Sequence, residues 1–426
     1  GNYRGVENTA PDGFVNNKAE HNVQVVYVDQ DTPAVVESVE FINERQKVEI
    51  SVEKQDAENG STIAGAEFGL YAKEDIKAGG KVIVKADEQL CTAVTGEDGT
   101  AIFEQNLPFG SYYIKELQAA YGFVSSDEII EVTVSYQGQD VEVVRLKEIF
   151  KNQPTTVEFR KSDLTTGVEL DGATLTVLDK DGNEIDKWTS VKGEPHIIKR
   201  LHVGETYILR EEFAPYGYLK AEEVEFTITD TAEIQKVEMK DDVPIGRIII
   251  NKKGEFLSEV SWNDMVAGAM DSIWGYVTGS LKDVTFEIYA REDIKAADGE
   301  SDDYYKKDEL VATIKTDELG IARTDDLPLG KYYVVEKETA DGFVLDGEPR
   351  DIDLTYRDQD TPVVTFDSEW QNSRQKAKVI VTKKEKDSDS VLEGGVFDLC
   401  AKEDIKNTDG DVHVKADTNM KQNDTD

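Results

Sequence analysis

The sequence contains few of the residue types on which many catalytic and metal-binding sites depend. Only two cysteines and four histidines occur among its 426 residues. Two cysteines in so long a chain exclude a disulfide scaffold, and we expect Cys91 and Cys400 to be ordinary thiols. The histidines show no spacing typical of metal ligands or of a nucleophile–histidine pair. We therefore expect no cofactor and no metal site, and an enzyme that turns over a substrate is the least favoured function.

Long hydrophobic runs and excess positive charge are also missing. No stretch of about 18 consecutive apolar residues occurs, so we expect no segment that spans a membrane. The 88 acidic residues outnumber the 48 lysines and arginines, which gives a formal net charge of −40. Nucleic acid is a poor partner because phosphate binding requires a basic surface, and docking on anionic membranes is disfavoured. We expect the acidity to keep an extended molecule soluble and self-repelling.

Apolar residues alternate with polar ones in short runs throughout the chain. Residues 48–56 and 157–163 are two such runs, and Gly, Asp and Asn mark the turns between runs. Strands at intervals of about 8–12 residues are typical of a β-sandwich. We predict an all-β fold, a tandem array of β-sandwich modules.

The modules are visible as internal repeats. Residues 3–47 match residues 332–376, and Asp-Gln-Asp-Thr-Pro occurs in both, at 29–33 and 358–362. Self-similarity of this kind defines structural repeats. We predict complete modules at 47–152, 153–242 and 243–373, between the C-terminal half of a module at 1–46 and the N-terminal half of another at 374–426. The chain thus begins and ends within a repeat, and we expect it to be a fragment whose last segment lacks a complete core.

The last complete module contains an insertion, about residues 255–281, that the other modules lack. Apolar residues recur there at intervals of three and four, namely Trp262, Met265, Val266, Ala269, Ile273 and Val277. This spacing is typical of an amphipathic helix. We predict a short helical insertion whose apolar face packs on its own or the neighbouring sandwich, with a partner surface as the alternative.

Each complete module carries a lysine, a glutamate and an amide or acid at matching positions. The lysine ends the first strand, and the amide or acid ends the last strand. The glutamate lies in a strand whose other residues have the pattern of a buried core strand. The three sets are Lys54, Glu116 and Asn152; Lys161, Glu211 and Asp241; and Lys252, Glu336 and Asn372. A buried charge is costly unless it has a partner or a task. Because a sandwich brings its first and last strands side by side, we expect each triplet to meet inside its module.

Such a triplet suits formation of an amide bond between side chains. Burial lowers the pKa of a lysine and raises that of a glutamate. A neutral amine is a nucleophile, and a protonated carboxyl can polarise the Asn carbonyl and pass a proton to departing ammonia. The predicted product is a Lys–Asn isopeptide bond, or a Lys–Asp bond with loss of water at Asp241. The alternative is that these residues are strand-end charges or simple salt bridges.

Two incomplete sets lie in the half-modules. Glu7 and Asn43 have no lysine partner within residues 1–46, and Lys383 has no glutamate partner within residues 374–426. We predict that these half-sites are not cross-linked.

Three motifs, ordered and repeated along the chain, resemble the Cna B-type repeats of Gram-positive bacterial surface proteins, also called SpaA-like or prealbumin-like. They are Lys-x-Asp at 54–56 and 161–163, Gly-Ala-x-Phe/Leu at 65–68 and 172–175, and Glu-x-x-Ala-Pro-x-Gly-aromatic at 7–14 and 211–218. The resemblance implies prealbumin-like β-sandwiches cross-linked by self-formed isopeptide bonds. It also implies an extracellular stalk, in a pilin or cell-wall-anchored adhesin, with the glutamate as proton shuttle.

The chain departs from this pattern at several positions. Ala-Pro is replaced by Ala-Ala at 119–120 and by Thr-Ala at 339–340. Lys252 is followed by Lys-Gly in place of x-Asp, which leaves Lys253 as an alternative nucleophile. Asp241 stands where the family usually has Asn, and Asp242 could compete with it.

The favoured function is therefore a structural stalk segment. One alternative is an adhesive module that binds a host extracellular-matrix protein or a glycan, directly through the long segments 72–84 and 290–307. These segments lack a cluster of anchoring aromatic residues. A second alternative is calcium binding at 179–183 or 298–303, but neither stretch has the full EF-hand loop with its closing glutamate.

Overall fold

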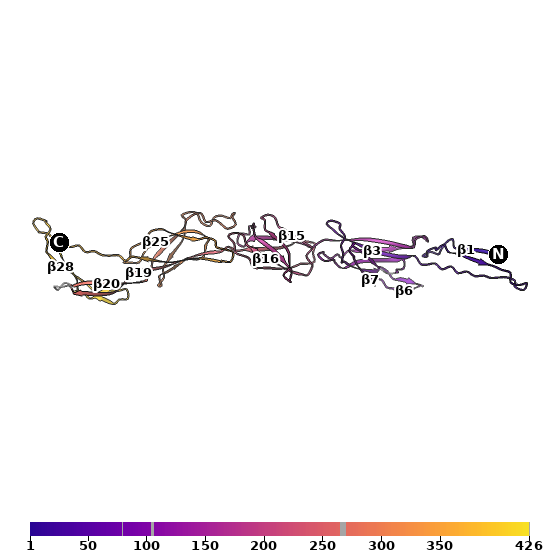
Figure 1. Ribbon diagram of the computed structural model, residues 1–426, viewed down its shortest axis with the longest axis horizontal. Coiled ribbons are helices and arrows are strands. Elements are labelled where there is room, and N and C mark those ends of the chain that lie inside the picture. Colours follow the sequence, from indigo (N-terminus) through magenta and orange to yellow (C-terminus); the bar gives the residue numbers. More distant parts are fainter. Residues whose placement is uncertain (79, 104–105, 265–269, 426) are drawn as a thin grey trace. The chain divides into compact units, whose positions relative to one another are not determined.

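The computed structural model describes residues 1–78, 80–103, 106–264 and 270–425. The regular elements within these residues are β-strands joined by turns, and none is an α-helix (Figure 1). The predicted all-β fold is confirmed. No helix long and apolar enough to cross a membrane occurs in this part of the chain.

The chain divides into two compact units. The first consists of residues 1–161, 174–211 and 222–239, and the second of residues 162–173, 212–221 and 240–426.

The first unit opens with a small hairpin, in which β1 (Asn2–Val6) pairs antiparallel with β2 (Glu20–Gln24). A sandwich of two sheets follows. In hydrogen-bonded order its strands are β11 (Val143–Asn152), β3 (Lys47–Asp56) and β8 (Thr100–Phe103) in one sheet, and β10 (Ile129–Val134), β9 (Gly110–Gln118), β4 (Glu67–Ala72) and β7 (Gln89–Val94) in the other. A short hairpin of β5 (Ile76–Ala78) and β6 (Lys81–Val84) follows β4.

The core of this sandwich forms because alternate residues of its strands point inward. Ile50 and Val52 of β3 and Tyr112 and Ile114 of β9 are fully buried in one cluster. The first and last strands, β3 and β11, are neighbours and run parallel, with Asp56 opposite Asn152. The expected contact between first and last strands is therefore present, and it places the ends of both strands together.

The next sandwich lies mostly in the first unit and has the same layout. Its strands are β15 (His196–Lys199), β12 (Thr156–Asp163) and β18 (Gln235–Asp241) in one sheet, and β14 (Glu184–Thr189), β13 (Thr174–Leu178), β16 (Thr206–Phe213) and β17 (Val224–Thr227) in the other. Phe159 packs edge-on against Phe226, and Leu175 and Leu209 are buried beside them.

The second unit contains a further sandwich. One of its sheets is formed by β22 (Leu310–Lys315), β21 (Thr285–Ala290), β25 (Gly330–Glu338) and β26 (Arg350–Leu354). In the other sheet the start of β19 (Ile245–Asp264) pairs parallel with β27 (Val363–Asn372) and antiparallel with β23 (Ile321–Arg323) and β24 (Leu327–Pro328). Ile250, Phe286 and Tyr332 are fully buried between these sheets.

The predicted helical insertion at 255–281 is wrong. The far end of β19 continues as a strand and pairs antiparallel with β20 (Met270–Ser280), with Phe256 opposite Val277 and Val260 opposite Trp274. Trp262 and Ile273 lie in these strands, whereas Met265, Val266 and Ala269 fall outside the described residues. Residues four apart lie on one side of a strand as well as of a helix, and the β-branched, aromatic and glycine residues here favour a strand.

Residues 374–426 contribute short strands to the second unit. β28 (Val396–Cys400) pairs with β31 (Asn419–Asp424), and β31 meets β20 where Lys421 lies opposite Asp271. β29 (Ile405–Lys406) and β30 (Val412–Val414) form a separate hairpin. Residues 376–383 form no strand, and Val379 and Ile380 are 65% and 74% exposed.

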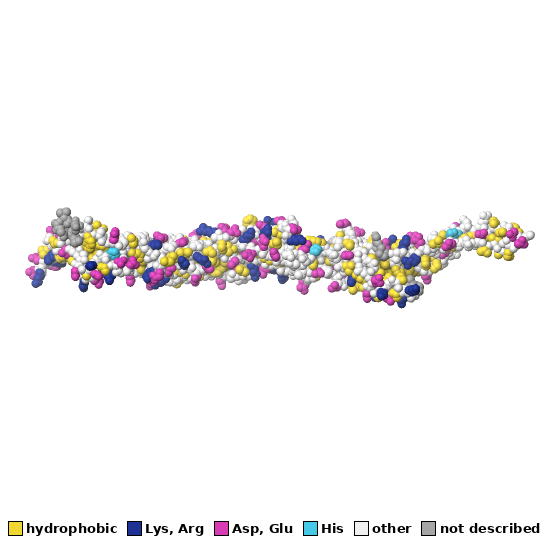
Figure 2. Space-filling model, turned by 90° about the horizontal axis from the view of Figure 1, so that it is seen from below, with side chains coloured by type: hydrophobic (Ala, Val, Ile, Leu, Met, Phe, Trp, Pro, Cys, Tyr) yellow, Lys and Arg dark blue, Asp and Glu magenta, His cyan; other side chains and the backbone are white. Residues whose placement is uncertain are grey.

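Acidic side chains are scattered among lysines and arginines over the visible face of the molecule (Figure 2). Many make exposed ion pairs, such as Lys73 with Glu131 and Arg247 with Asp326. Exposed pairs of this kind contribute little to stability, about 0–1 kcal/mol each, so the fold depends on the sandwich cores.

Replacement of Leu70 by Ala should therefore destabilise the 47–152 sandwich by about 2–5 kcal/mol, because Leu70 is fully buried between its sheets. The measurement is the free energy of opening of β9 amides by hydrogen exchange under denaturant. Leu117→Ala is the matched control, since Leu117 is 41% exposed, and an equal loss in both variants would contradict this assignment of the core.

Candidate functional site

Lys54, Glu116 and Asn152 meet inside the 47–152 sandwich. Lys54 lies near the end of β3, Asn152 ends β11, and Glu116 comes from β9 in the opposite sheet. The Lys54 and Glu116 side chains are 0% and 1% exposed, and Asn152 is 2% exposed. The parallel register of β3 and β11 and the facing sheet thus bring together three polar groups separated by up to 98 positions.

One carboxylate oxygen touches both other groups. Glu116 Oε1 lies 2.9 Å from Lys54 Nζ and accepts a hydrogen bond of 2.9 Å from Asn152 Nδ2. Lys54 Nζ also donates to Asn152 Oδ1 at 2.5 Å. The backbone N–H of Ser126 donates to Glu116 Oε2 and fixes the carboxylate from its far side. A proton could pass from the amine to the amide nitrogen through Glu116 without any movement of the backbone.

The surroundings of Lys54 favour its neutral form. The rings of Phe68 and Phe150 lie with their centroids 5.3 Å and 5.7 Å from Nζ. Burial among these rings lowers the pKa of Lys54 below its ordinary value, although the nearby Glu116 carboxylate acts in the opposite direction. A lowered pKa increases the fraction of free amine, which is the nucleophilic form.

The same arrangement occurs in the second unit. Lys252 Nζ lies 2.7 Å from Glu336 Oε2, and Asn372 Nδ2 donates to Glu336 Oε1. Burial also lowers the pKa of Lys252, and the Phe286 ring lies 5.7 Å from Nζ. Asn372 Nδ2 donates in addition to Thr339 Oγ1 at 2.8 Å. Within the described residues, Asn372 Oδ1 is buried without a hydrogen-bond partner, so the amine contact seen at Asn152 is not made here.

In the middle sandwich Lys161 and Glu211 are brought together. Lys161 Nζ lies 3.0 Å from Glu211 Oε1, and both side chains are buried. Asp241 ends β18, the neighbour of β12 in its sheet, and is fully buried. Asp242, the possible competitor of Asp241, is exposed.

The half-sites differ from one another. Asn43 Nδ2 donates to Glu7 Oε1 at 2.7 Å, as the amide does in the complete sites. Among the described residues, Glu7 Oε2 and Asn43 Oδ1 are buried and have no hydrogen-bond partner. Lys383 is exposed and lies outside any strand.

Burial and hydrogen bonding bear on two alternatives from the sequence, namely Lys253 as the nucleophile and calcium binding at two stretches. Lys252 is 1% exposed beside Glu336, whereas Lys253 is only partly buried. At the first suggested calcium stretch, the Asp179 carboxylate accepts hydrogen bonds from the backbone N–H groups of Asp181 and Asn183. Asp298 accepts equivalent bonds at the second. In the part of the chain that the structure describes, no three potential ligands cluster as a metal site.

Sequence reasoning missed two parts of these sites. The aromatic residues around the amines, Phe68, Phe150 and Phe286, are indistinguishable in sequence from ordinary core residues of an alternating strand. Thr339 lies where the family motif has Ala, and this departure at position 339 was the only signal that it could contact the amide.

The fold and these sites agree with a known domain family. The family model described as SpaA, prealbumin-like fold domain, matches residues 48–148, 155–243 and 276–370, more than half of the chain. The chain belongs to the SpaA prealbumin-like family. The last of these SpaA-type matches begins at residue 276, within β20 and downstream of Lys252.

Several solved structures are similar to this SpaA-type chain. The TIE protein of Bacillus anthracis is 23% identical, with a TM-score of 0.47 over 78% of this chain and 52% of that one. BcpA, the major pilin subunit of Bacillus cereus, is 16% identical, with a TM-score of 0.37 over 77% and 100%. The full-length major pilin SpaD of Corynebacterium diphtheriae is 15% identical, with a TM-score of 0.32 over 77% and 98%.

The chain spans about half the length of the TIE protein. No curated protein sequence shows a significant match to it.

The lowered pKa of Lys54 predicts a pH dependence in an Asn152→Ala variant, which retains Lys54 and Glu116 but has no amide to attack. Between the folded-state pKa and the unfolded value of 10.5, the unfolded chain binds more protons. Stability of this sandwich should therefore rise with pH through that window. The measurement is the urea midpoint from neutral pH upward, with Lys54→Met/Asn152→Ala as control. Parallel profiles in the two variants would show that Lys54 is not responsible.

Proposed function

We propose that the chain is a segment of a structural stalk in a Gram-positive bacterial surface protein, whose sandwiches are locked by self-formed isopeptide bonds. The observation that carries this proposal is the position of Glu116 Oε1, which lies 2.9 Å from both the Lys54 amine and the Asn152 amide nitrogen. Membership of the SpaA family supports a structural role. The complete protein is extracellular and is either anchored to the cell wall or assembled as a pilus.

The reaction at Asn152 is an acyl transfer within one sandwich. The neutral Lys54 amine attacks Asn152 Cγ, so that an Nζ–Cγ bond forms and the Cγ–Nδ2 bond breaks. One amine proton passes through Glu116 to Nδ2, which leaves as ammonia. Lys252, Glu336 and Asn372 follow the same scheme. At Asp241 the neutral Lys161 amine attacks Cγ of the protonated carboxyl, so that an Nζ–Cγ bond forms and the bond from Cγ to the hydroxyl breaks. The hydroxyl leaves as water with one amine proton passed through Glu211.

The driving force includes removal of buried charge. A lysine and a glutamate buried together keep several kcal/mol of desolvation cost each, which their mutual attraction offsets only in part. The amide product is neutral, so the cross-link removes the buried ammonium charge. Each site reacts once and in cis, so the protein is not an enzyme that turns over a substrate.

The bond lies where tension on the chain would pass. Tension enters a sandwich at the start of β3 and leaves at the end of β11, and these parallel neighbours would otherwise be held by non-covalent contacts alone. A Lys54–Asn152 bond transfers the load to a covalent link. It also closes a loop of 98 positions, which by the loop-entropy model stabilises the fold by roughly 4–5 kcal/mol.

The proposed modules are residues 47–152, 153–242 and 243–373, each with one bond. Residues 1–46 and 374–426 carry the half-sites Glu7 with Asn43 and Lys383. A host matrix protein or glycan as partner would concern the complete protein.

Intact mass spectrometry tests the proposal directly. The purified chain should be lighter than its sequence by two ammonia molecules, for Asn152 and Asn372, and by one water for Asp241. Glu116→Ala should restore the mass of one ammonia and leave the other two bonds in place, as peptide mapping would show. Glu131→Ala is the matched control because Glu131 makes an exposed ion pair with Lys73 in the same sandwich. An unmodified mass in the parent chain would refute the cross-links.

A further inference from the structure

Two loops of the chain make the same set of contacts with two different turns. One loop lies between β10 and β11 and contains Tyr136 and Gln139, and the other lies between β26 and β27 and contains Tyr356 and Gln359. Each contacts the turn that follows the glutamate of the preceding module. The first turn follows Glu7, and the second follows Glu211. Each contact joins residues of a single compact unit. The first contact lies in the first unit and the second contact lies in the second unit.

The glutamine side chain bridges the turn in both places. Gln139 Oε1 accepts a hydrogen bond from the Ala10 N–H at 2.7 Å, and Gln359 Oε1 accepts one from the Ala214 N–H at 2.8 Å. The side-chain Nε2 of each glutamine faces the backbone carbonyl of the residue two positions before that alanine. Gln139 faces Asn8 and Gln359 faces Glu212, both at 3.5 Å. Both edges of the amide therefore face backbone groups of the turn, and the shorter bond is the one that the side-chain oxygen accepts.

The backbone and the tyrosine repeat as well. The carbonyl oxygens of Gln139 and Gln359 accept hydrogen bonds of 3.0 Å from Asn16 N–H and Lys220 N–H, six residues after the respective alanines. Tyr136 Oη donates to the Phe14 carbonyl at 3.5 Å, and Tyr356 Oη donates to the Tyr218 carbonyl at 3.0 Å. Four contacts thus recur with identical spacing along both chain segments.

The bound turns share a local sequence. Both read Ala-Pro-x-Gly-aromatic, and their glycines, Gly13 and Gly217, have φ values of +92° and +96°. This left-handed backbone favours glycine and turns the chain so that it meets the loop. The turn after Glu116 has Ala-Ala instead, and a different set of groups meets it: Asp230 accepts from the Ser125 N–H, and Arg200 covers the Phe123 ring.

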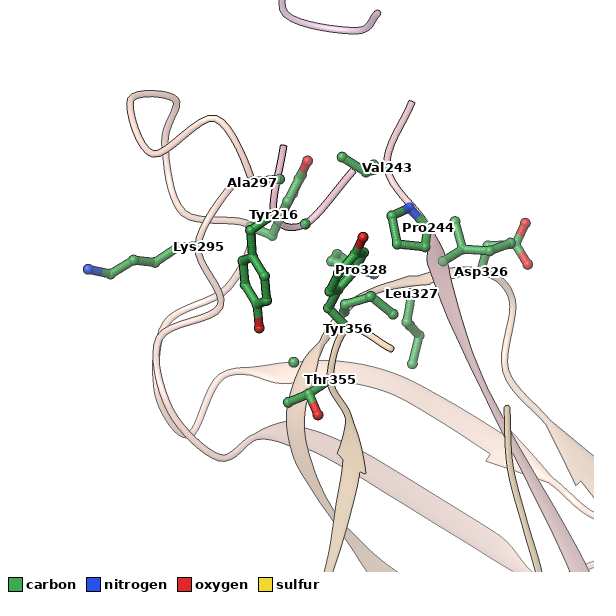
Figure 3. A pocket seen from close by; sticks show the side chains of 15 residues that line it. Tyr216, Val243, Pro244, Lys295, Ala297, Asp326, Leu327, Pro328, Thr355 and Tyr356 are labelled. Atoms are coloured by element: carbon green, nitrogen blue, oxygen red, sulfur yellow. The ribbon is translucent and has the colours of Figure 1, made fainter. Parts of the chain in front are cut away.

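The polar contacts of the second turn lie beside a partly open pocket. A cavity of about 370 Å³ lies there, lined by Tyr216, Val243, Pro244, Leu327 and Tyr356 among others (Figure 3). The rings of Tyr216 and Tyr356 meet edge-on at its border, with centroids 4.9 Å apart. The hydrogen bonds of Gln359 and Tyr356 thus hold the 214–218 turn beside this pocket.

From this repeated geometry we infer that each Tyr-x-x-Gln loop positions the glutamate of the preceding module, which is the half-site Glu7 in one case and the proton-shuttle Glu211 in the other. Ala10 and Ala214, which the glutamines hold, lie three residues after Glu7 and Glu211. Gln359 also contacts the carbonyl of Glu212, directly next to Glu211. The rate of cross-linking at Lys161 therefore depends on the folding of the 243–373 module that follows. Gln359 acts through Glu211 and is a positioning residue. This inference rests on the proposed isopeptide reaction for its chemical part only.

The docking itself is tested by residue-resolved hydrogen exchange. Gln359→Ala should accelerate exchange of the Ala214 amide about fivefold, the effect expected from loss of one neutral hydrogen bond. The Lys220 amide should keep its rate because its acceptor is the backbone carbonyl of residue 359. Gln139→Ala should accelerate the Ala10 amide in the same way. Unchanged rates at both alanines would overturn the docking.

The positioning role is tested by the rate of cross-linking at Lys161. Peptide mapping at fixed times after cell-free synthesis should show the Lys161–Asp241 bond forming about fivefold more slowly in Gln359→Ala. The Lys252–Asn372 bond should form at its parent rate. Gln359→Glu, which keeps the acceptor oxygen, should recover most of the rate, and the exposed neighbour variant Arg357→Ala should match the parent.

The two parts of the inference fail separately. An equal rate of Lys161–Asp241 formation in Gln359→Ala and the parent, with faster Ala214 exchange, would overturn the positioning role and leave the docking. If the parent chain forms no bond at Lys161, the proposed function fails at that site and with it the positioning role, while hydrogen exchange still decides the docking.

Discussion

The parallel contact between the first and last strands of a sandwich is the constraint on which the rest of the structure depends. Parallel neighbours cannot be joined by a tight turn and need a long connection. Here that connection is the whole remainder of the sandwich, so β3 and β11 close its fold as they pair, and β19 and β27 do the same. This closure brings a lysine and an asparagine 98 positions apart into contact beneath the glutamate of the facing sheet.

Repetition made the sites predictable from sequence. A lysine, a glutamate and an amide each conflict with the apolar pattern of their strands, and the conflict recurs at matching positions in three modules. The phenylalanines around Lys54 could not be assigned in this way, because a core aromatic residue and one that desolvates an amine follow the same alternation. Residues 255–281 were wrongly predicted to be helical because residues four apart lie on one side of both a helix and a strand. Only the pairing of β20 with β19 decides between the two.

The turns after Glu7 and Glu211 each have contacts on two sides. On one side each turn continues from the strand or segment that carries the carboxylate, and on the other it contacts a loop of the next module through Gln139 or Gln359. The separate modules of a tandem array are therefore linked by more than the covalent chain. Interfaces between domains of one chain are commonly small and polar, and here a few hydrogen bonds at a defined turn connect one module to the next.

The position of the lysine near the end of the first strand determines how much chain a sandwich can release. With Lys54 joined to Asn152, a pulled chain passes along β3, crosses the side-chain bond and leaves, and the residues between them carry no load. Fully extended, a loop of 98 positions would add roughly 320–350 Å at about 3.3–3.6 Å per residue. The linked sandwich cannot release that length of chain, even when its two sheets separate. Each module is then nearly inextensible, and a stalk built from such modules holds a fixed reach under tension.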